Sequence, residues 1–274
     1  MSQVRPSRAG FHDQHASAAT LGPTQVITNS RFAQWLEDLQ ARHLADLRFS
    51  EVTRALRALS SGYVERRRRL AERSAFDTAG KRAAYALYYS PLHFMTVSLI
   101  TQALAATRPP GSRVLDVGCG AGASGAAWAA QLRSTTVVGI DSHPWAIGEA
   151  ALTYRAFGLA HETRRGHTAR LAFPRSANAI VAGWTLNELD EASRAAVQTK
   201  LLHAARAGGA VLIVEPIATR VSPWWDDWID TFSRAGGRAD EWRFPVELPD
   251  LLQRLDRAAG MRHDELKAKS IYVG

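Results

Sequence analysis

Apolar side chains in the first part of the chain recur at three- and four-residue spacing, which is typical of helices packed on one side. The two sets with this spacing are Phe32, Trp35, Leu36, Leu39 and Leu44, followed by Val52, Leu56, Leu59 and Val64. Residues 83–104 are apolar and rich in aromatic side chains, and they predict two helices separated at Ser90-Pro91, because the residue before a proline disfavours helical geometry. We therefore expect residues 25–110 to form a helical N-terminal subdomain.

Residues 1–24 are mostly Ser, Ala, Gly, Pro and His, with few large apolar side chains. Such a composition buries too little apolar surface to offset the conformational entropy lost on ordering. We expect a mobile tail.

From Ser112 onward, short apolar segments alternate with helical patterns. The expected strands are 114–117, 137–140, 162–166, 179–182, 210–214, 262–266 and 270–273, and the expected helices are 126–132, 144–156, 191–205 and 248–259. This alternation is typical of a doubly wound, mostly parallel sheet with helices on both faces. The sequence predicts an α/β fold with a seven-stranded sheet over residues 111–274.

Composition narrows the class of protein. With 274 residues, 46% hydrophobic and 22% charged, the chain is typical of a globular protein. It has no apolar run near the ~20 residues of a membrane span, and its start lacks a secretory signal, so we expect a cytoplasmic protein without membrane contact. Cys119, the single cysteine, rules out an internal disulfide and a four-cysteine cage, and no metal site is expected.

Positive charge is concentrated in the first part of the chain. Residues 1–110 hold 15 Lys and Arg against 8 Asp and Glu, whereas residues 111–274 hold 19 against 18. This asymmetry is typical of a surface that meets a polyanion such as RNA, although 30 of the 34 cations are Arg, which coding bias also produces. The run Arg66–Arg69 fits either a phosphate contact or a solvated helix face.

A glycine loop follows the first expected strand. Gly118, Gly120 and Gly122 allow a sharp turn and let a ligand lie against main-chain N–H groups at a helix start. The spacing from Gly120 to Gly125 also matches a dinucleotide site. Asp116 distinguishes the two, because a carboxylate there would repel a pyrophosphate but would favour the ammonium and sulfonium groups of S-adenosylmethionine.

A second carboxylate supports a nucleoside ligand. Asp141 ends the second expected strand, 25 residues after Asp116, where it can accept hydrogen bonds from ribose hydroxyls. The adjacent Ser142 is expected to belong to the same site. The sequence therefore predicts S-adenosylmethionine as the cofactor.

Residues 110–274 resemble the class I S-adenosylmethionine-dependent methyltransferases. The likeness lies in the segment Val114-Leu-Asp-Val-Gly-Cys-Gly-Ala-Gly122, in Asp141 and in the segment 180–182. In more detail the chain is similar to the small-ribosomal-subunit methyltransferase-like family of bacteria and mitochondria, through segments 84–91, 185–189 and 212–216. It departs from that family because one cysteine cannot form the family's cysteine cluster, and because the basic C-terminal tail is missing.

The resemblance implies roles for several residues. Asn187 and Glu188 would border the methyl group as the catalytic pair, with Asn187 orienting the acceptor and Glu188 accepting a proton. Trp184 would face the cofactor, and His167 would contact its adenine. The competing interpretations are that Asn187 and Glu188 cap the helix that begins near residue 190, and that His167 is an ordinary surface or core histidine.

Aromatic residues outside these motifs also allow two interpretations. Trp224 and Trp228 share a helical face, so they either stack on an acceptor or belong to a packed amphipathic helix. Tyr88 and Tyr89 are further candidates for the pocket wall.

The leading hypothesis is an S-adenosylmethionine-dependent methyltransferase that acts on RNA, with small-subunit ribosomal RNA or the ribosomal small subunit as partner. The alternatives are a small-molecule methyltransferase and a non-catalytic ribosome-assembly factor that retains the fold. A nicotinamide oxidoreductase ranks last, because of Asp116. The sequence does not predict the oligomeric state.

Overall fold

The computed structural model describes residues 30–65, 76–109, 111–132, 135–174 and 177–274. The expected tail (1–24) and the run Arg66–Arg69 lie outside these ranges.

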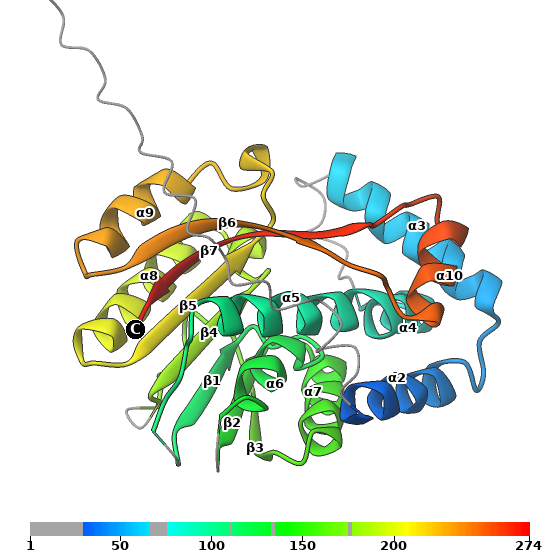
Figure 1. Ribbon diagram of the computed structural model, residues 1–274, viewed down its shortest axis with the longest axis horizontal. Coiled ribbons are helices and arrows are strands. Elements are labelled where there is room, and N and C mark those ends of the chain that lie inside the picture. The colour runs from blue at the N-terminus through cyan, green and yellow to red at the C-terminus, as the bar shows by residue number, and fades with distance from the viewer. Residues whose placement is uncertain (1–29, 66–75, 110, 133–134, 175–176) are drawn as a thin grey trace, which may run out of the picture.

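One seven-stranded sheet in the order β3-β2-β1-β4-β5-β7-β6 forms the centre of the molecule (Figure 1). Its parallel strands are β1 (Arg113–Val117), β2 (Thr136–Asp141), β3 (Ala160–Arg165), β4 (Ala179–Gly183) and β5 (Ala210–Glu215). The last two strands, β6 (Arg238–Pro245) and β7 (Glu265–Val273), are antiparallel, and β7 lies between β5 and β6. The expected α/β fold with a mostly parallel seven-stranded sheet is confirmed.

Helices cover both faces of the sheet, which explains why the central strands are continuous apolar runs. On one face, Val114 packs in a cluster with α5 (Ser90–Ala103), α6 (Ala123–Ala129) and α7 (Pro144–Ala156). On the other face, its neighbour Leu115 packs in a cluster with α8 (Glu191–Arg206) and α9 (Trp225–Ser233). Successive residues of β1 thus serve two separate cores, as the alternation of side chains along a strand requires.

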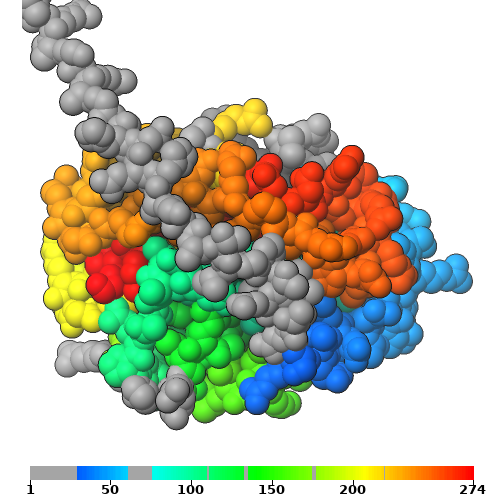
Figure 2. All heavy atoms as spheres, in the orientation of Figure 1, coloured from blue at the N-terminus to red at the C-terminus, as the bar shows by residue number. Residues whose placement is uncertain are grey.

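The N-terminal helices extend the first of these cores. They are α2 (Ser30–His43), α3 (Phe49–Glu65) and α4 (Ala79–Ala84). Phe32 and Trp35 of α2 are almost fully buried, and the Trp35 ring centroid lies 5.4 Å from that of Phe157, just after α7. Arg57 of α3 donates a hydrogen bond to the carbonyl of Ala258 in α10 (Asp250–Ala258), and the two helices lie side by side in Figures 1 and 2.

The expected break at Ser90-Pro91 is wrong. A π-helical turn, η2 (Tyr85–Tyr89), leads without interruption into α5. The Ser90 N–H donates to the carbonyl of Tyr85, five residues back, so the helical turn just before the proline contains one residue more than an α-helical turn. Pro91 then occupies the first turn of α5, where its missing N–H and fixed φ are tolerated.

The end of the chain also differs from expectation. The two strands expected at 262–266 and 270–273 are one strand, β7, and β6 was not expected at all. Of the two lysines between the expected strands, Lys267 is exposed, whereas Lys269 is 5% exposed with its ammonium on Ser222. β6 was not predicted from the sequence because it is an edge strand whose residues alternate between exposed and half-buried.

Candidate functional site

Four loops meet at the carboxyl edge of the parallel strands, where open α/β sheets bind their ligands. The glycine loop (residues 118–122) follows β1, Asp141 ends β2, Trp184 follows β4, and Glu215 ends β5. Thr185 joins two of these loops, because its hydroxyl donates to the carbonyl of Gly118 at 3.0 Å. The structure therefore brings most of the expected site residues to one edge.

Glycine is required in this loop for two reasons: other side chains approach it closely, and its backbone has positive φ values. Gly118, Gly120 and Gly122 have φ values of +66°, +50° and +80°. A Cβ on Gly118 would lie 2.2 Å from the Thr185 side chain, and one on Gly120 would lie 2.6 Å from the hydroxyl of Tyr85. Side chains from the loop after β4 and from η2 therefore press directly on the glycine loop, and Tyr85 forms part of the site.

Asp116 lies beneath the loop rather than beside an open surface. It is 1% exposed, and its Oδ2 accepts hydrogen bonds from the N–H of Gly125 and the hydroxyl of Tyr154, both at 2.9 Å. Burial raises the pKa of Asp116 to about 7, against the lowering effect of these two hydrogen bonds. The carboxylate thus meets the positive end of α6, where a dinucleotide would place its pyrophosphate.

Asp141 is positioned by the backbone on both sides of it. Its Oδ2 accepts from the Gly120 N–H at 3.0 Å and its Oδ1 accepts from the His143 N–H at 2.8 Å. Burial raises its pKa, although these hydrogen bonds oppose the shift. Each carboxylate oxygen retains a second lone pair, so the residue fits the hydroxyl pair of a ribose. The adjacent Ser142 is exposed, and its carbonyl accepts a hydrogen bond from Arg165 at 3.4 Å.

Aromatic rings stand next to Asp141. The ring of Phe76 lies 5.2 Å from His143, 4.8 Å from Trp145 and 4.8 Å from Tyr85, measured between centroids. These rings form an apolar wall that fits the flat base of a nucleoside.

A second group of rings, which we call the ring cluster, consists of Tyr85, Tyr89, His93 and Trp184. The indole of Trp184 stacks on the imidazole of His93, with centroids 3.8 Å apart and 5° between the planes. Trp184 has φ +53°, which is unusual for a residue other than glycine. Burial lowers the pKa of His93 to about 3. Trp184 and Tyr89 were expected at the site from the sequence, whereas His93 and Tyr85 were not, although the spacing of residues 85, 89 and 93 indicates one helix face.

Asn187 and Glu188 belong to a 3-10 turn (Leu186–Glu188) held by a buried carboxylate. Glu215 accepts hydrogen bonds from the backbone of Leu186 at 2.9 Å and from the side-chain amide of Asn187. The Oδ1 of Asn187 is buried and has no hydrogen-bond partner among the described residues. Glu188 is exposed and lies close enough to Tyr85 for its charge to raise that pKa, although burial is the larger cause. The cap of α8 is Asp190, which accepts from the N–H of Ser193 at 2.7 Å.

His167 lies in the turn after β3, and its hydrogen bond is made within that turn and not to the glycine loop. Its Nδ1 accepts a hydrogen bond from the N–H of Ala169 at 3.3 Å. In this position its ring supports a local turn. Contact with an adenine remains a prediction.

Other candidates resolve into packing. Trp228 of α9 is 4% exposed in the second core, and Trp224, which precedes α9, is half-buried with its ring centroid 4.8 Å from that of Trp228, so α9 is a packed amphipathic helix. Tyr88 is fully buried and bonded to Asp256. Cys119 is buried.

Within the described residues, no group of three or more His, Cys, Asp or Glu side chains is arranged to hold a metal ion. No described helix combines the length and apolar character of a membrane span.

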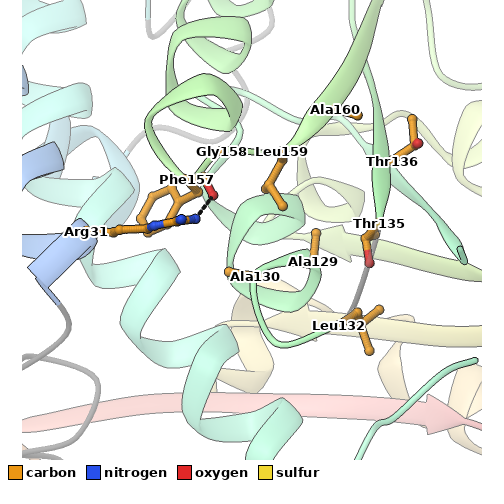
Figure 3. Close-up of a pocket in the computed structure, with 10 residues that line it drawn as sticks. All are labelled: Arg31, Ala129, Ala130, Leu132, Thr135, Thr136, Phe157, Gly158, Leu159 and Ala160. Carbon is orange, nitrogen blue, oxygen red and sulfur yellow. Dashed lines mark hydrogen bonds between the residues drawn. The ribbon is translucent and has the colours of Figure 1, made fainter. Parts of the chain in front are cut away.

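A pocket of about 460 Å³ lies at the other edge of the sheet (Figure 3). It opens beside the first residues of β2 and β3, Thr136 and Ala160. Arg31 closes one side by donating a hydrogen bond to the carbonyl of Phe157 at 2.6 Å. Because this pocket lies at the amino edge, it is separate from the glycine loop.

Residues 114–209 match a family model described as "Methyltransferase domain". This range contains the glycine loop, Asp141 and the turn with Asn187 and Glu188. A comparison with curated proteins gives no match to this chain.

Solved structures with a similar backbone include two methyltransferases. One is a TehB-like SAM-dependent methyltransferase from Corynebacterium glutamicum, with 19% identity, 78% of this chain and 97% of that chain covered, and a TM-score of 0.43. Another is a SAM-dependent methyltransferase from Geobacter sulfurreducens in complex with S-adenosyl-L-homocysteine, with 16% identity, coverages of 66% and 90%, and a TM-score of 0.42. The similarity is distant in both sequence and backbone.

The similarity to a methyltransferase domain covers residues 114–209, less than half of the chain. It confirms the expected enzyme class and the expected cofactor, S-adenosylmethionine. It supports the broader of the two resemblances noted in the sequence.

Proposed function

We propose that the protein transfers a methyl group from S-adenosylmethionine to a small organic acceptor at the carboxyl edge of the sheet. The observation that carries this proposal is the position of Asp141, which is tied to the glycine loop through Gly120 and has lone pairs to spare for a ribose. Asp116 of β1, whose carboxylate accepts a hydrogen bond from the Gly125 N–H in the first turn of α6, supports a ligand without phosphate.

Residues of this chain hold and orient the reactants. Asp141 binds the ribose hydroxyls, and the rings of Phe76 and Tyr85 flank the nucleoside. The cofactor supplies an activated methyl group on a sulfonium, so alignment in a dry site provides most of the rate enhancement. Asn187 and Glu188 border the acceptor, with Asn187 offering its buried Oδ1 to an N–H or O–H group.

RNA is the second candidate acceptor. The surplus of seven positive charges in residues 1–110 favours it. Among the 15 Lys and Arg residues of this segment, the seven arginines at positions 5, 8, 66–69 and 73 lie outside the described residues. A small-subunit ribosomal RNA substrate would bind with affinity that falls steeply as salt rises.

Calorimetry of S-adenosylmethionine binding tests the proposal. We expect binding to the full chain, and a loss of about 10-fold or more in Asp141→Ala, since hydrogen bonds to a charged group contribute about 1.5–3 kcal/mol. Glu162→Gln, which changes an exposed acid on the neighbouring strand β3, is the matched control and should bind like the wild type.

A second titration with small-subunit RNA at two salt concentrations separates the acceptor classes. Salt-sensitive RNA binding together with methyl incorporation into the RNA would favour the second candidate. Binding of a nicotinamide dinucleotide without binding of S-adenosylmethionine would overturn the proposal.

A further inference from the structure

The ring cluster forms a surface that a ligand can reach. Tyr85, Tyr89, His93 and Trp184 are all partly exposed, whereas Tyr88 on the same helical stretch is fully buried. The cluster stands at the carboxyl edge of β4, and the Tyr85 hydroxyl connects it to the glycine loop. These rings therefore border the expected cofactor site, with Tyr89 and Trp184 also packed against the first core.

The helix carrying three of these rings is adapted to present them together. The ring centroids of Tyr85, Tyr89 and His93 are 6.1–6.3 Å apart in every pairing, although the residues span eight positions. The π-turn η2 lies within this span, and π-turns in α-helices frequently occur at functional sites. The planes of these rings are inclined to one another by 38°, 81° and 44°, so the cluster offers both ring faces and ring edges to an aromatic ligand.

Trp184 closes the cluster at an energetic cost. Its φ of +53° is unfavourable for a residue with a bulky side chain. The backbone holds this conformation because the Trp184 N–H donates to the carbonyl of Val214 at 2.8 Å, and the indole stacks on His93. Backbone strain of this kind concentrates at ligand-binding sites.

His93 is the one ring of the cluster with an unused proton acceptor. The structure gives its ring nitrogens no hydrogen-bond partner among the described residues, and its partial exposure leaves them within reach of a ligand. Burial keeps the imidazole neutral, because it lowers the pKa to about 3. The charges nearest the cluster, Glu188 and Asp141, are acidic, so they disfavour an anionic acceptor.

We propose that the ring cluster is the methyl-acceptor subsite, that it takes a flat aromatic compound whose nucleophilic atom carries a proton, and that His93 receives this proton. The acceptor is a phenol or an N–H heteroaromatic compound. This inference rests on the proposed function and specifies its acceptor and its catalytic residue.

The transfer balances without any further reactant. The acceptor atom forms a bond to the methyl carbon while the carbon–sulfur bond breaks, and that electron pair stays on sulfur. The O–H or N–H group becomes strongly acidic as the new bond forms, so even a weakly basic imidazole accepts its proton. The proton then passes from His93 to water.

The experiment uses the full chain saturated with S-adenosylhomocysteine, a product that cannot react. Phenols and N–H heteroaromatic compounds, each paired with its methylated counterpart, are titrated while tryptophan emission is recorded, and Trp184→Phe identifies the signal from Trp184. Labelled methyl transfer is measured in parallel with S-adenosylmethionine. His93→Phe retains a ring against Trp184 but lacks a nitrogen, and His203→Phe, at an exposed position of α8, is the matched control.

The proposal expects the unmethylated compounds to bind more tightly than their methylated counterparts. His93→Phe should weaken acceptor binding by about 10-fold and slow transfer by about 100-fold, with the affinity for S-adenosylhomocysteine unchanged. His203→Phe should behave like the wild type. His93→Gln, which restores an acceptor oxygen, should recover binding but not rate, and it serves as the second variant if His93→Phe does not fold.

Two results would overturn the inference alone: S-adenosylhomocysteine binding with no response to any aromatic compound, or equal transfer by wild type and His93→Phe, including transfer to RNA. If the wild type fails to bind S-adenosylhomocysteine, the proposed function falls, and the inference falls with it. If the inference holds, the affinities for the phenols and for the N–H heteroaromatic compounds identify which of these two classes the subsite accepts.

Discussion

The carboxylate of Glu149 on α7 accepts two hydrogen bonds from the guanidinium of Arg42 on α2, at 2.7 and 2.9 Å. His43 lies 3.2 Å from the same carboxylate. Glu149 is 4% exposed, so this ion pair fastens the N-terminal helices to the methyltransferase domain through a buried charge. Burial alone would raise the pKa of Glu149, but His43 and Arg42 outweigh it and hold the pKa at about 2.

Replacement of Glu149 by Gln should lower the free energy of unfolding by about 1.5–3 kcal/mol at pH 7, because the hydrogen bonds lose their charge. The folded pKa lies below the ordinary value of 4.5, so this stabilisation is present above pH 4.5 and is lost as the pH falls towards 2. Urea denaturation at pH 7 and pH 3 measures both effects. Glu162→Gln breaks an exposed pair with Arg164 and should change stability by less than about 1 kcal/mol. Equal losses in the two variants would contradict this account.

Asp116 should show the opposite dependence on pH. Its folded pKa of about 7 lies above its ordinary value, so its contribution to stability is greatest below pH 3.8 and declines as the pH rises through 7. Asp116→Asn keeps an oxygen for Gly125 and Tyr154 and should remove this decline without unfolding the protein. Asp116→Ala loses both hydrogen bonds and should cost about 1–3 kcal/mol. Thermal unfolding of the three proteins between pH 4 and 8 tests the prediction, and parallel pH profiles for wild type and Asp116→Asn would refute it.

Gly120→Ala should disrupt the glycine loop. Its new Cβ would lie 2.6 Å from the hydroxyl of Tyr85 at a φ of +50°, and the backbone conformation alone costs about 1–2 kcal/mol. Tyr85→Phe removes the hydroxyl, so it should relieve the steric part in a double variant but leave the backbone part. Gly148→Ala, in α7 with nothing within 4 Å, should instead stabilise by about 0.5–1 kcal/mol. Additive losses in the double variant would show that Tyr85 does not press on the loop.

Asn187→Asp should be more damaging than Asn187→Ala at neutral pH. The new carboxylate would face Glu215, which now accepts the amide of Asn187, and two acids in contact cannot both ionise without cost. We expect an extra loss of about 2 kcal/mol at pH 8 that shrinks at pH 5, where one acid holds a proton. Thermal midpoints at the two pH values measure it. A pH-independent difference between the variants would argue against contact with Glu215.

The strands β1, β2, β4 and β5 were predictable because they are buried on both faces and their sequences are therefore apolar runs. β6 was not, since Arg238–Pro245 is an edge strand whose charged residues resemble a loop. β7 continues through Lys269, although a lysine is rarely buried. In this fold its ammonium contacts Ser222 and lies 4.5 Å from the Trp225 ring centroid.

The candidate site was predictable where residues are close in sequence. The glycine loop and Asp141 follow adjacent strands, so strand order was enough to bring them together. His93 meets Trp184 only because η2 and α5 lie across the carboxyl edge, and no local pattern encodes that contact. The π-helical turn before Pro91 was not predicted for the same reason, because a π-turn depends on which carbonyl accepts the hydrogen bond from the Ser90 N–H.

The position of β7 has a consequence for synthesis of the protein on the ribosome. β6 is made first but is joined to the sheet only through β7. While the chain emerges, β6 and the exposed edge of β5 must wait for residues 265–273, and during that interval both present unpaired backbone groups to other chains. Chains whose synthesis stops before residue 265 should therefore aggregate, even though their parallel strands are already complete.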